Sequence, residues 1–169
     1  MKQLIVLLLF IHTLFATIVN AEALPEYTLK TAYIYNFALL TDWPEDEQSA
    51  DFNICFYKKD FGEASEVLEN KKFNNQTIKI FTISNSDDAK KCKIVFIRKD
   101  EENKGEALIQ ELLGKQILIV SENKNLSNSH IAILKDNNKL AFNVNLKTLK
   151  MSNLVVSSRL LKLAKDINK

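Results

Sequence analysis

The chain has few of the residues that mark common nucleotide-binding and enzyme sites. Its 169 residues include three glycines, two prolines and two histidines. The glycines are isolated, at Gly62, Gly105 and Gly114, so the sequence contains no glycine-rich phosphate-binding loop. It also contains no linker rich in proline and glycine, no internal repeat and no low-complexity tract. These absences and the chain length together predict one compact domain.

Metal and nucleophile chemistry have equally little support. Of the two histidines, His12 lies in an N-terminal segment that we expect to be removed, which leaves His130. One histidine and two distant cysteines do not provide a recognisable zinc-ligand spacing. Ser157 and Ser158 lack the flanking glycines of a nucleophile elbow, and His130 lies in a strand pattern that favours a structural imidazole. The sequence therefore predicts no catalytic residue, no metal site and no cofactor.

An excess of charge of one sign is also missing. The 23 lysines and arginines are nearly balanced by 21 aspartates and glutamates, which gives a formal net charge of +2 at pH 7. This balance gives no electrostatic reason to expect nucleic acid or an anionic membrane as the main partner. Hydrophobic residues make up 46% of the chain, which is enough to bury a core.

The N-terminus has the pattern of a secretory signal peptide. Lys2 precedes an apolar stretch, Leu4 to Ile11, and Val19-Asn20-Ala21 resembles a cleavage site with small residues at its two key positions. The alternative is a membrane anchor, but the whole apolar stretch is shorter than the roughly 20 residues that span a bilayer. We expect residues 1–21 to be a signal peptide cleaved after Ala21, and residues 22–169 to form an exported domain.

The two cysteines, Cys55 and Cys92, both lie in the part of the chain that is expected to be exported. An even pair in an exported chain is more often a disulfide than a thiol site. A bridge would close a loop of 37 residues. In the chain-entropy model such a loop contributes roughly 3–4 kcal/mol. The alternative is two unpaired buried cysteines that pack as small hydrophobic side chains.

Hydrophobic periodicity predicts alternating helices and strands. Leu29, Tyr33, Phe37 and Leu40 recur at helical spacing, which predicts an amphipathic helix that ends before Pro44. Strands are predicted at 51–57, 77–83, 93–97, 116–120, 130–134 and 139–144, and further helices around 63–69, 108–113, 146–151 and 158–167. Residues 98–105 are predicted to form a loop. Gly114 is expected at a helix C-terminus, and Ser157 is expected to cap the last helix.

The order of these elements predicts the fold class. Strands that alternate with helices indicate a parallel sheet, and the Asp136-Asn137-Asn138 turn between the last two strands indicates an antiparallel hairpin. We therefore predict a single α/β domain. Its mixed, mostly parallel sheet has five to six strands and is flanked by helices on both faces.

Five segments of the chain, in this order and spacing, resemble the YfiR family of small periplasmic proteins. They are KTAYIYNFALLTDWP (30–44), FNICFYKKDFG (52–62), CKIVFI (92–97), ILIVSE (117–122) and LAFNVNLKTLKMSNLVVSSRLLKLAK (140–165). The resemblance covers nearly all of residues 22–169. Its most specific parts are the YNF…WP motif and the SSRLLKLA block.

The resemblance implies a periplasmic regulator that forms dimers. The best-known member represses an inner-membrane diguanylate cyclase by holding its periplasmic sensor domain inactive, and an outer-membrane lipoprotein with a peptidoglycan-binding domain can sequester the repressor; we expect this chain to act in the same way. Cys55 and Cys92 fall where the family has a cysteine pair, which strengthens the disulfide prediction. A second disulfide of the best-known member has no counterpart here. The signalling partner of a relative can also be a histidine kinase.

The sequence leaves two functions open. A repressor needs exposed side chains that contact its partner, and the candidates are Tyr35, Trp43, Arg159 and Leu161. Each of them could equally be core packing or ordinary surface. The alternative is a periplasmic small-ligand-binding protein that feeds a membrane sensor kinase. A large exposed apolar patch favours the first function, whereas a concave apolar pocket with a few convergent polar groups favours the second.

Overall fold

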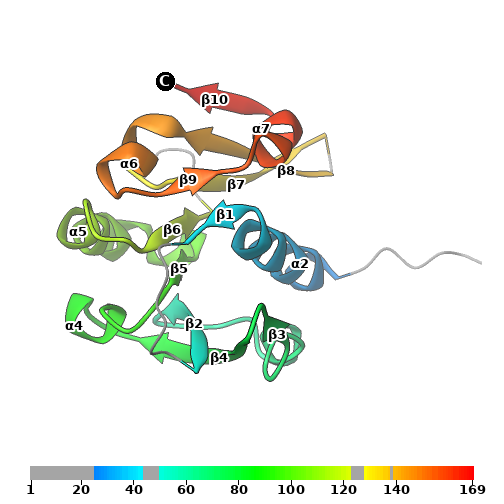
Figure 1. Ribbon diagram of the computed structural model, residues 1–169, viewed down its shortest axis with the longest axis vertical. Helices are drawn as coiled ribbons and strands as arrows, with labels where there is room; N and C mark the ends of the chain where they lie inside the picture. The colour runs from blue at the N-terminus through cyan, green and yellow to red at the C-terminus, as the bar shows by residue number, and fades with distance from the viewer. Residues whose placement is uncertain (1–24, 44–49, 123–127, 138) are drawn as a thin grey trace, which may run out of the picture.

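A computed structural model of the chain describes residues 25–43, 50–122, 128–137 and 139–169 (Figure 1). The predicted signal peptide, residues 1–21, lies outside the described residues and stays a prediction. The main sheet has eight strands in the order β10-β8-β7-β6-β5-β2-β4-β3. Figure 1 shows this sheet from its edge strand β10 at the top to β3 at the bottom. The fold is the mixed, mostly parallel α/β architecture that the sequence predicts.

The parallel part of the sheet follows a doubly wound order. It consists of β2 (Asp51–Tyr57), β4 (Gln76–Ile83), β5 (Ile94–Ile97), β6 (Leu118–Ser121) and β7 (Ile131–Asp136). In space these strands lie in the order β4-β2-β5-β6-β7, which is the 2-1-3-4-5 order of flavodoxin-type folds. The topological switch point therefore lies between β2 and β5.

Three strands complete the sheet at its edges. β3 (Lys72–Phe73) pairs antiparallel with β4, β8 (Lys139–Asn145) pairs antiparallel with β7, and β10 (Asp166–Asn168) runs parallel to β8. The β7–β8 pair is the predicted hairpin. The prediction of five to six strands was too low because β3 and β10 have only two and three residues. Such short segments carry no readable alternation.

The last helix is shorter than predicted. α7 covers Ser158–Leu163, whereas the apolar spacing predicted a helix over 158–167. Ala164 has extended backbone angles, with φ −67° and ψ 139°, and the Lys165 N–H donates to the carbonyl of Phe142 at 2.8 Å. Pairing with β8 therefore overrides the helical periodicity. Ser157 caps α7 as predicted, since its side chain accepts a hydrogen bond from the Leu160 N–H.

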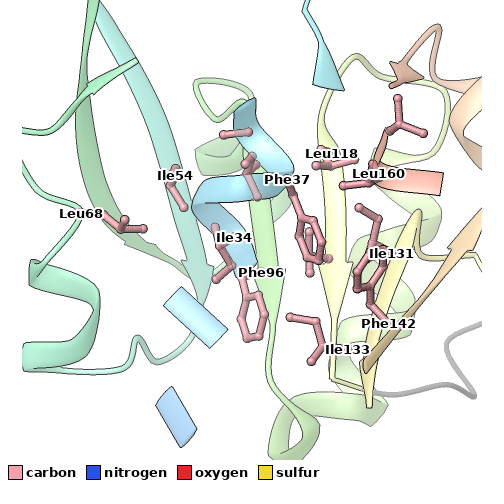
Figure 2. Close-up of a cluster of buried hydrophobic side chains, with 14 of the residues drawn as sticks. Ile34, Phe37, Ile54, Leu68, Phe96, Leu118, Ile131, Ile133, Phe142 and Leu160 are labelled. Carbon is pink, nitrogen blue, oxygen red and sulfur yellow. The ribbon is translucent and has the colours of Figure 1, made fainter. Parts of the chain in front are cut away.

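One face of the sheet is covered by α2 (Glu26–Leu39) and carries an aromatic core. Figure 2 shows Ile34 and Phe37 of α2 pointing into this core, toward Phe96 and Leu118 of the sheet. The predicted stripe was wrong in part, because Leu29 is 37% exposed, whereas Ile34 is fully buried. Since α2 has apolar residues around most of its circumference, only its contact with the sheet decides which of them are buried.

The other face of the sheet is covered by α5 (Glu102–Leu112). This helix begins earlier than predicted, directly after a 3-10 turn at Lys99–Glu101, so the predicted loop over 98–105 was wrong beyond this turn. The charged residues of its first turn carry no apolar repeat, which hid the start of the helix. A Cβ at Gly105 would lie 2.6 Å from the Ile97 side chain, so glycine is required for the close packing of α5 on β5. Gly114 follows the helix with a φ of 81°.

A disulfide joins Cys55 of β2 to Cys92 on the α5 face of the sheet, with 5.9 Å between the two Cα atoms. The structure thus confirms the predicted bridge. Strand residues alternate between the two cores: Ile94 and Phe96 face α2, whereas Val95 faces α5. Burial on both sides explains why β5 is a continuous apolar run.

The remaining elements are short. They are α3 (Glu63–Glu66), α4 (Ser86–Ala89), α6 (Leu146–Met151), and a separate two-stranded antiparallel sheet of β1 (Thr41–Asp42) and β9 (Val155–Val156). α6 has the bounds that the sequence predicts, and α3 is shorter than the predicted segment 63–69. The β1–β9 pair connects the C-terminal end of α2 to the start of α7.

Candidate functional site

A groove with a mostly apolar lining lies between α2 and α7 and has a volume of about 690 Å3. We call it the α2–α7 groove. It is lined by nine apolar or aromatic residues and two polar ones: Leu29, Ala32, Tyr33, Asn36, Phe37, Leu39, Leu40, Phe142, Arg159, Leu160 and Leu163. Its walls are the outward side of α2 and the side of α7, and its floor is formed by aromatic rings of the α2-face core.

The floor of the groove is tightly packed. The rings of Phe37 and Phe142 meet edge to face with 5.0 Å between their centroids, and the Tyr33 ring lies 5.8 Å from Phe142. The Tyr33 hydroxyl donates to the carbonyl of Leu140 at 3.0 Å. Edge-to-face rings with a bonded hydroxyl form a defined surface, because each ring has one favoured orientation.

The two walls are held together at both ends of α7. At its start, β1 and β9 pair, and the Ser157 N–H donates to the carbonyl of Leu40 at 2.8 Å. At its end, the backbone of Lys165 bonds to Phe142 and leads into β10. Because these contacts fix the walls before anything binds, the protein would lose less conformational entropy when a ligand enters this groove.

Three leucines make the groove an exposed apolar surface. Leu29, Leu39 and Leu163 are 37%, 48% and 64% exposed. Arg159, which is exposed, is the one charged side chain among the described residues that line the groove. The arrangement suits an apolar side chain of a ligand or partner that carries a carboxylate nearby, because a guanidinium pairs well with carboxylates.

Two of the predicted partner-binding residues lie away from this groove. The indole N–H of Trp43 donates to the carbonyl of Ala38 at 2.9 Å, and its ring meets Phe52 edge to face at 5.1 Å. The Tyr35 hydroxyl lies 3.4 Å from the carbonyl of Lys72. Both side chains are half-buried against the α2-face core. Their role in partner binding stays a prediction.

The other two predicted residues lie on α7. Arg159 lines the groove, whereas Leu161 is half-buried against the α2-face core. Leu29 and Leu163 were missed as surface residues because their helical spacing assigned them to the buried stripe. A hint was available in the sequence: α2 has more apolar and aromatic residues than one buried stripe requires, so some of them must be exposed.

The carboxyl edge of the parallel strands, where ligands bind in many α/β folds, is covered by the first turn of α2. The Lys30 ammonium is 2.7 Å from Glu122 and also pairs with Glu26, which in turn lies 2.5 Å from Lys135. Burial alone would lower the pKa of Lys30, but the two carboxylates outweigh it and raise that pKa. Lys135 and Lys30 lower the pKa of Glu26.

The switch point itself is filled by the chain's own side chains. The Arg98 guanidinium donates to the carbonyl of Asp60 and to the hydroxyl of Tyr27, both at 3.0 Å, and lies over the Tyr27 ring. Tyr27 in turn stacks on Phe61 with 4.8 Å between centroids. The α2–α7 groove, and not this edge, is therefore the candidate site.

His130 is fully buried and hydrogen-bonded at both ring nitrogens. Its Nδ1 accepts from the Ile119 N–H at 2.9 Å, so the proton is on Nε2, which lies 3.0 Å from the Ser152 hydroxyl. Burial lowers its pKa to about 4. The ring connects β6, β7 and the end of α6, which is a structural role.

The described residues contain neither a metal-binding cluster nor a membrane-spanning helix. Among them, no group of three or more histidine, cysteine, aspartate or glutamate side chains is arranged to hold a metal ion. In the same part of the chain, no helix has the length and hydropathy needed to cross a bilayer.

The family of the chain is shown by a match that covers most of its length. A family model described as YfiR/HmsC-like matches residues 27–165, a range that contains both walls of the groove and both cysteines. The chain belongs to the YfiR/HmsC-like family. This family is periplasmic and regulatory rather than catalytic, and it indicates a regulator of cyclic-di-GMP signalling.

Comparisons outside the family are less informative. No curated protein matches the chain. A solved structure described as the ABC domain in complex with L-Trp from Streptococcus pneumonia matches with a TM-score of 0.52 and 7% identity. The match covers 83% of this chain and 60% of that one, so the chain spans well under the full length of that protein. At this identity the likeness shows the fold alone.

Proposed function

We propose that this protein binds the periplasmic sensor domain of an inner-membrane diguanylate cyclase and holds it in an inactive conformation, which lowers cyclic-di-GMP output. The observation that carries the proposal is the α2–α7 groove, in which three exposed leucines surround a rigid aromatic floor. An apolar surface of this kind on a member of a regulatory family is best explained by a protein partner.

The groove suits one mode of recognition in particular. An amphipathic helix of the sensor would place its apolar side chains between α2 and α7, with an acidic residue directed at Arg159. To inhibit, the protein must bind the inactive sensor better than the active one. Moving an equilibrium from 1:99 to 99:1 requires about 5.5 kcal/mol of preference. A homodimer that engages a dimeric sensor twice would reach this more easily, because its second contact gains avidity.

An outer-membrane, peptidoglycan-associated lipoprotein is the proposed antagonist. It would sequester the repressor in the periplasm and release the sensor. The predicted homodimer, the sensor and this lipoprotein are together the partners of the proposal.

A second candidate function is supported by the volume of the groove. About 690 Å3 lies within the range of small-molecule sites, and the described lining is apolar apart from Asn36, Arg159 and the Tyr33 hydroxyl. In this alternative the protein is a periplasmic small-ligand-binding protein that feeds a membrane sensor kinase.

The test is affinity capture from the organism of origin. The tagged protein is compared with Leu163→Asp, which places a charge in the groove, and with the matched control Val67→Asp. Val67 is 56% exposed and does not line the groove. We expect the unmodified protein and the control to retain a membrane protein that has a periplasmic sensor and a cyclase domain. Leu163→Asp should lose this protein, and cellular cyclic-di-GMP should rise.

Two outcomes would contradict the proposal. If Leu163→Asp retains the cyclase as well as the control does, the groove is not the docking surface. If no cyclase is captured, and a small molecule copurifies with the unmodified protein but not with Leu163→Asp, the small-ligand function takes first place.

A further inference from the structure

A second groove lies at the amino ends of β2, β5 and β6, at the edge of the sheet opposite to the switch point. It has a volume of about 470 Å3 and is lined by four lysines and one aspartate. Lys90, Lys91 and Lys93 come from the connection between α4 and β5, and Lys115 comes from the connection between α5 and β6. We call it the lysine groove. It shares no lining residue with the α2–α7 groove.

The lysines project from a rigid backbone. Cys92, which lies between Lys91 and Lys93, is covalently bonded to Cys55 of β2. The Lys93 N–H donates to the carbonyl of Asn53 at 2.8 Å, and the side-chain amide of Asn53 donates to the carbonyl of Lys91 at 2.8 Å. The backbones of Lys91 and Lys93 are therefore anchored by the disulfide between them and β2 and by these two hydrogen bonds.

The contacts of Lys90 and Lys91 inside the protein leave much of the positive charge of these two side chains available to solvent. The Lys90–Asp87 pair, at 2.7 Å, joins two largely exposed side chains, and such pairs contribute little. Lys91 lies over the Phe81 ring, with its ammonium 4.1 Å from the ring centroid, and contact with a neutral ring does not cancel its charge. Lys90 and Lys115 follow the C-terminal ends of α4 and α5, where a cation is favoured. Two of the four lysines of the groove therefore lie where a helix end stabilises a positive charge.

We propose that the lysine groove binds an acidic, extended peptide segment of a protein partner. The groove is concave, which fits a chain better than a flat lipid surface, and its volume is that of a site for a drug-sized molecule. A lysine ammonium group pairs with a carboxylate without requiring a fixed two-point geometry. Carboxylates spaced along an extended chain can therefore pair with several lysines. The side-chain amide of Gln116 and the apolar Ile117 complete the lining for a peptide backbone and its side chains.

The test uses a fluorescein-labelled peptide of alternating glutamate and glycine, the same peptide with glutamine in place of glutamate, and fluorescence anisotropy. The variant Lys91→Glu with Lys115→Glu is compared with Lys104→Glu with Lys147→Glu. This second pair makes the same change of net charge at exposed lysines outside both grooves. Charge reversal at Lys91 and Lys115 should weaken the affinity for the glutamate peptide by about ten-fold or more. The control variant at Lys104 and Lys147 should change this affinity by less than about two-fold.

Circular dichroism and thermal unfolding check that each variant folds. Lys91→Gln with Lys115→Gln is the milder variant if the charge reversal does not fold, and it should weaken binding in the same direction. Equal losses in the groove and control variants, or equal binding of the glutamine peptide, would overturn the proposal. So would lysine-dependent binding to phosphatidylglycerol vesicles without binding of the glutamate peptide, because the groove would then serve a lipid surface.

Discussion

The two faces of the sheet are built from different side chains. The α2-face core contains seven buried phenylalanines, including Phe37 and Phe142. The α5-face core is mainly aliphatic, with Tyr57 as its buried aromatic residue among those described, and it contains the disulfide. One face therefore depends on the packing of rings, and the other is held by a covalent bond as well.

Because the two cores differ, substitutions in them should affect partner binding differently, even where they lower the free energy of unfolding alike. The α2–α7 groove takes its floor from the rings of the α2-face core, so a cavity there changes the shape of the groove as well as the free energy of unfolding. The α5-face core contributes no residue to the groove. A change on that face should lower stability and leave the groove in place.

The largest expected effect is that of Phe37→Ala. Phe37 is 1% exposed, and replacing a buried phenylalanine by alanine costs about 3–5 kcal/mol because transfer energy is lost and a cavity remains. Urea unfolding followed by circular dichroism measures the loss. The matched control is Leu112→Ala in α5, a fully buried residue for which about 2–5 kcal/mol is expected. Phe37→Ala should also lose the captured sensor; if Leu112→Ala loses it equally while folded, the separation of the two faces is wrong.

Removing the disulfide should have the next largest effect. In the chain-entropy model, the double change Cys55→Ala with Cys92→Ala costs about 3–4 kcal/mol for a loop of 37 residues. The urea midpoint should fall for this variant. Dithiothreitol should lower the midpoint of the unmodified protein to the same value and leave that of the variant unchanged. An unchanged midpoint in the variant would mean that packing alone holds the α5 face.

A pH effect comes from the buried ring of His130, which is hydrogen-bonded to β6 and to Ser152 after α6. His130 has a pKa of about 4 in the folded protein and about 6.5 when unfolded, so the unfolded chain binds an extra proton between these values. The free energy of unfolding should therefore fall as the pH falls from 6.5 to 4, by up to about 3 kcal/mol. Above pH 6.5 the residue contributes no pH dependence, since both states are neutral.

Urea unfolding at a series of pH values measures this slope, with His130→Asn as the comparison. The variant should lose the slope between about pH 6.5 and 4.5. Glu26, whose folded pKa is lowered from 4.5, contributes stability that is lost only below that window. A slope that persists between these values in the variant would assign it to another group.

The smallest expected effect is that of Leu163→Ser on stability. Leu163 is 64% exposed, and such surface changes usually lie within about 0.5 kcal/mol. Binding of the sensor should nevertheless weaken, because the side chain forms part of the groove wall. A large loss of stability here would show that α7 belongs to the core and not to a docking surface.

Several features were predictable from the sequence because their causes are local. The β-branched and aromatic composition of Asp51–Tyr57 predicted a strand, and the polar turn at 136–138 predicted the hairpin. The position of Ser157 as a helix cap predicted the start of α7. The disulfide followed from the expected export of a chain with two cysteines. Each of these features depends on a few neighbouring residues or on the cellular compartment, so none of them requires knowledge of how the core packs.

The groove could not be predicted in the same way. Leu29 and Phe37 fit one helical stripe equally well, yet the structure buries Phe37 and exposes Leu29. The predicted helical pattern continued to residue 167, yet α7 ends at Leu163 and residues 166–168 pair with β8. In each case a backbone partner or a neighbouring core far away in the sequence outweighed the local preference.

The sequence by itself determined the fold class, the disulfide and the family, since strand and helix periodicity, paired cysteines and ordered motifs are properties of the chain alone. Only the tertiary structure decided which apolar residues remain exposed, and so where a partner can dock. The physical reason is that an apolar side chain is buried by whatever lies opposite it, and for α2 and α7 that surface is assembled from strands distant in the sequence.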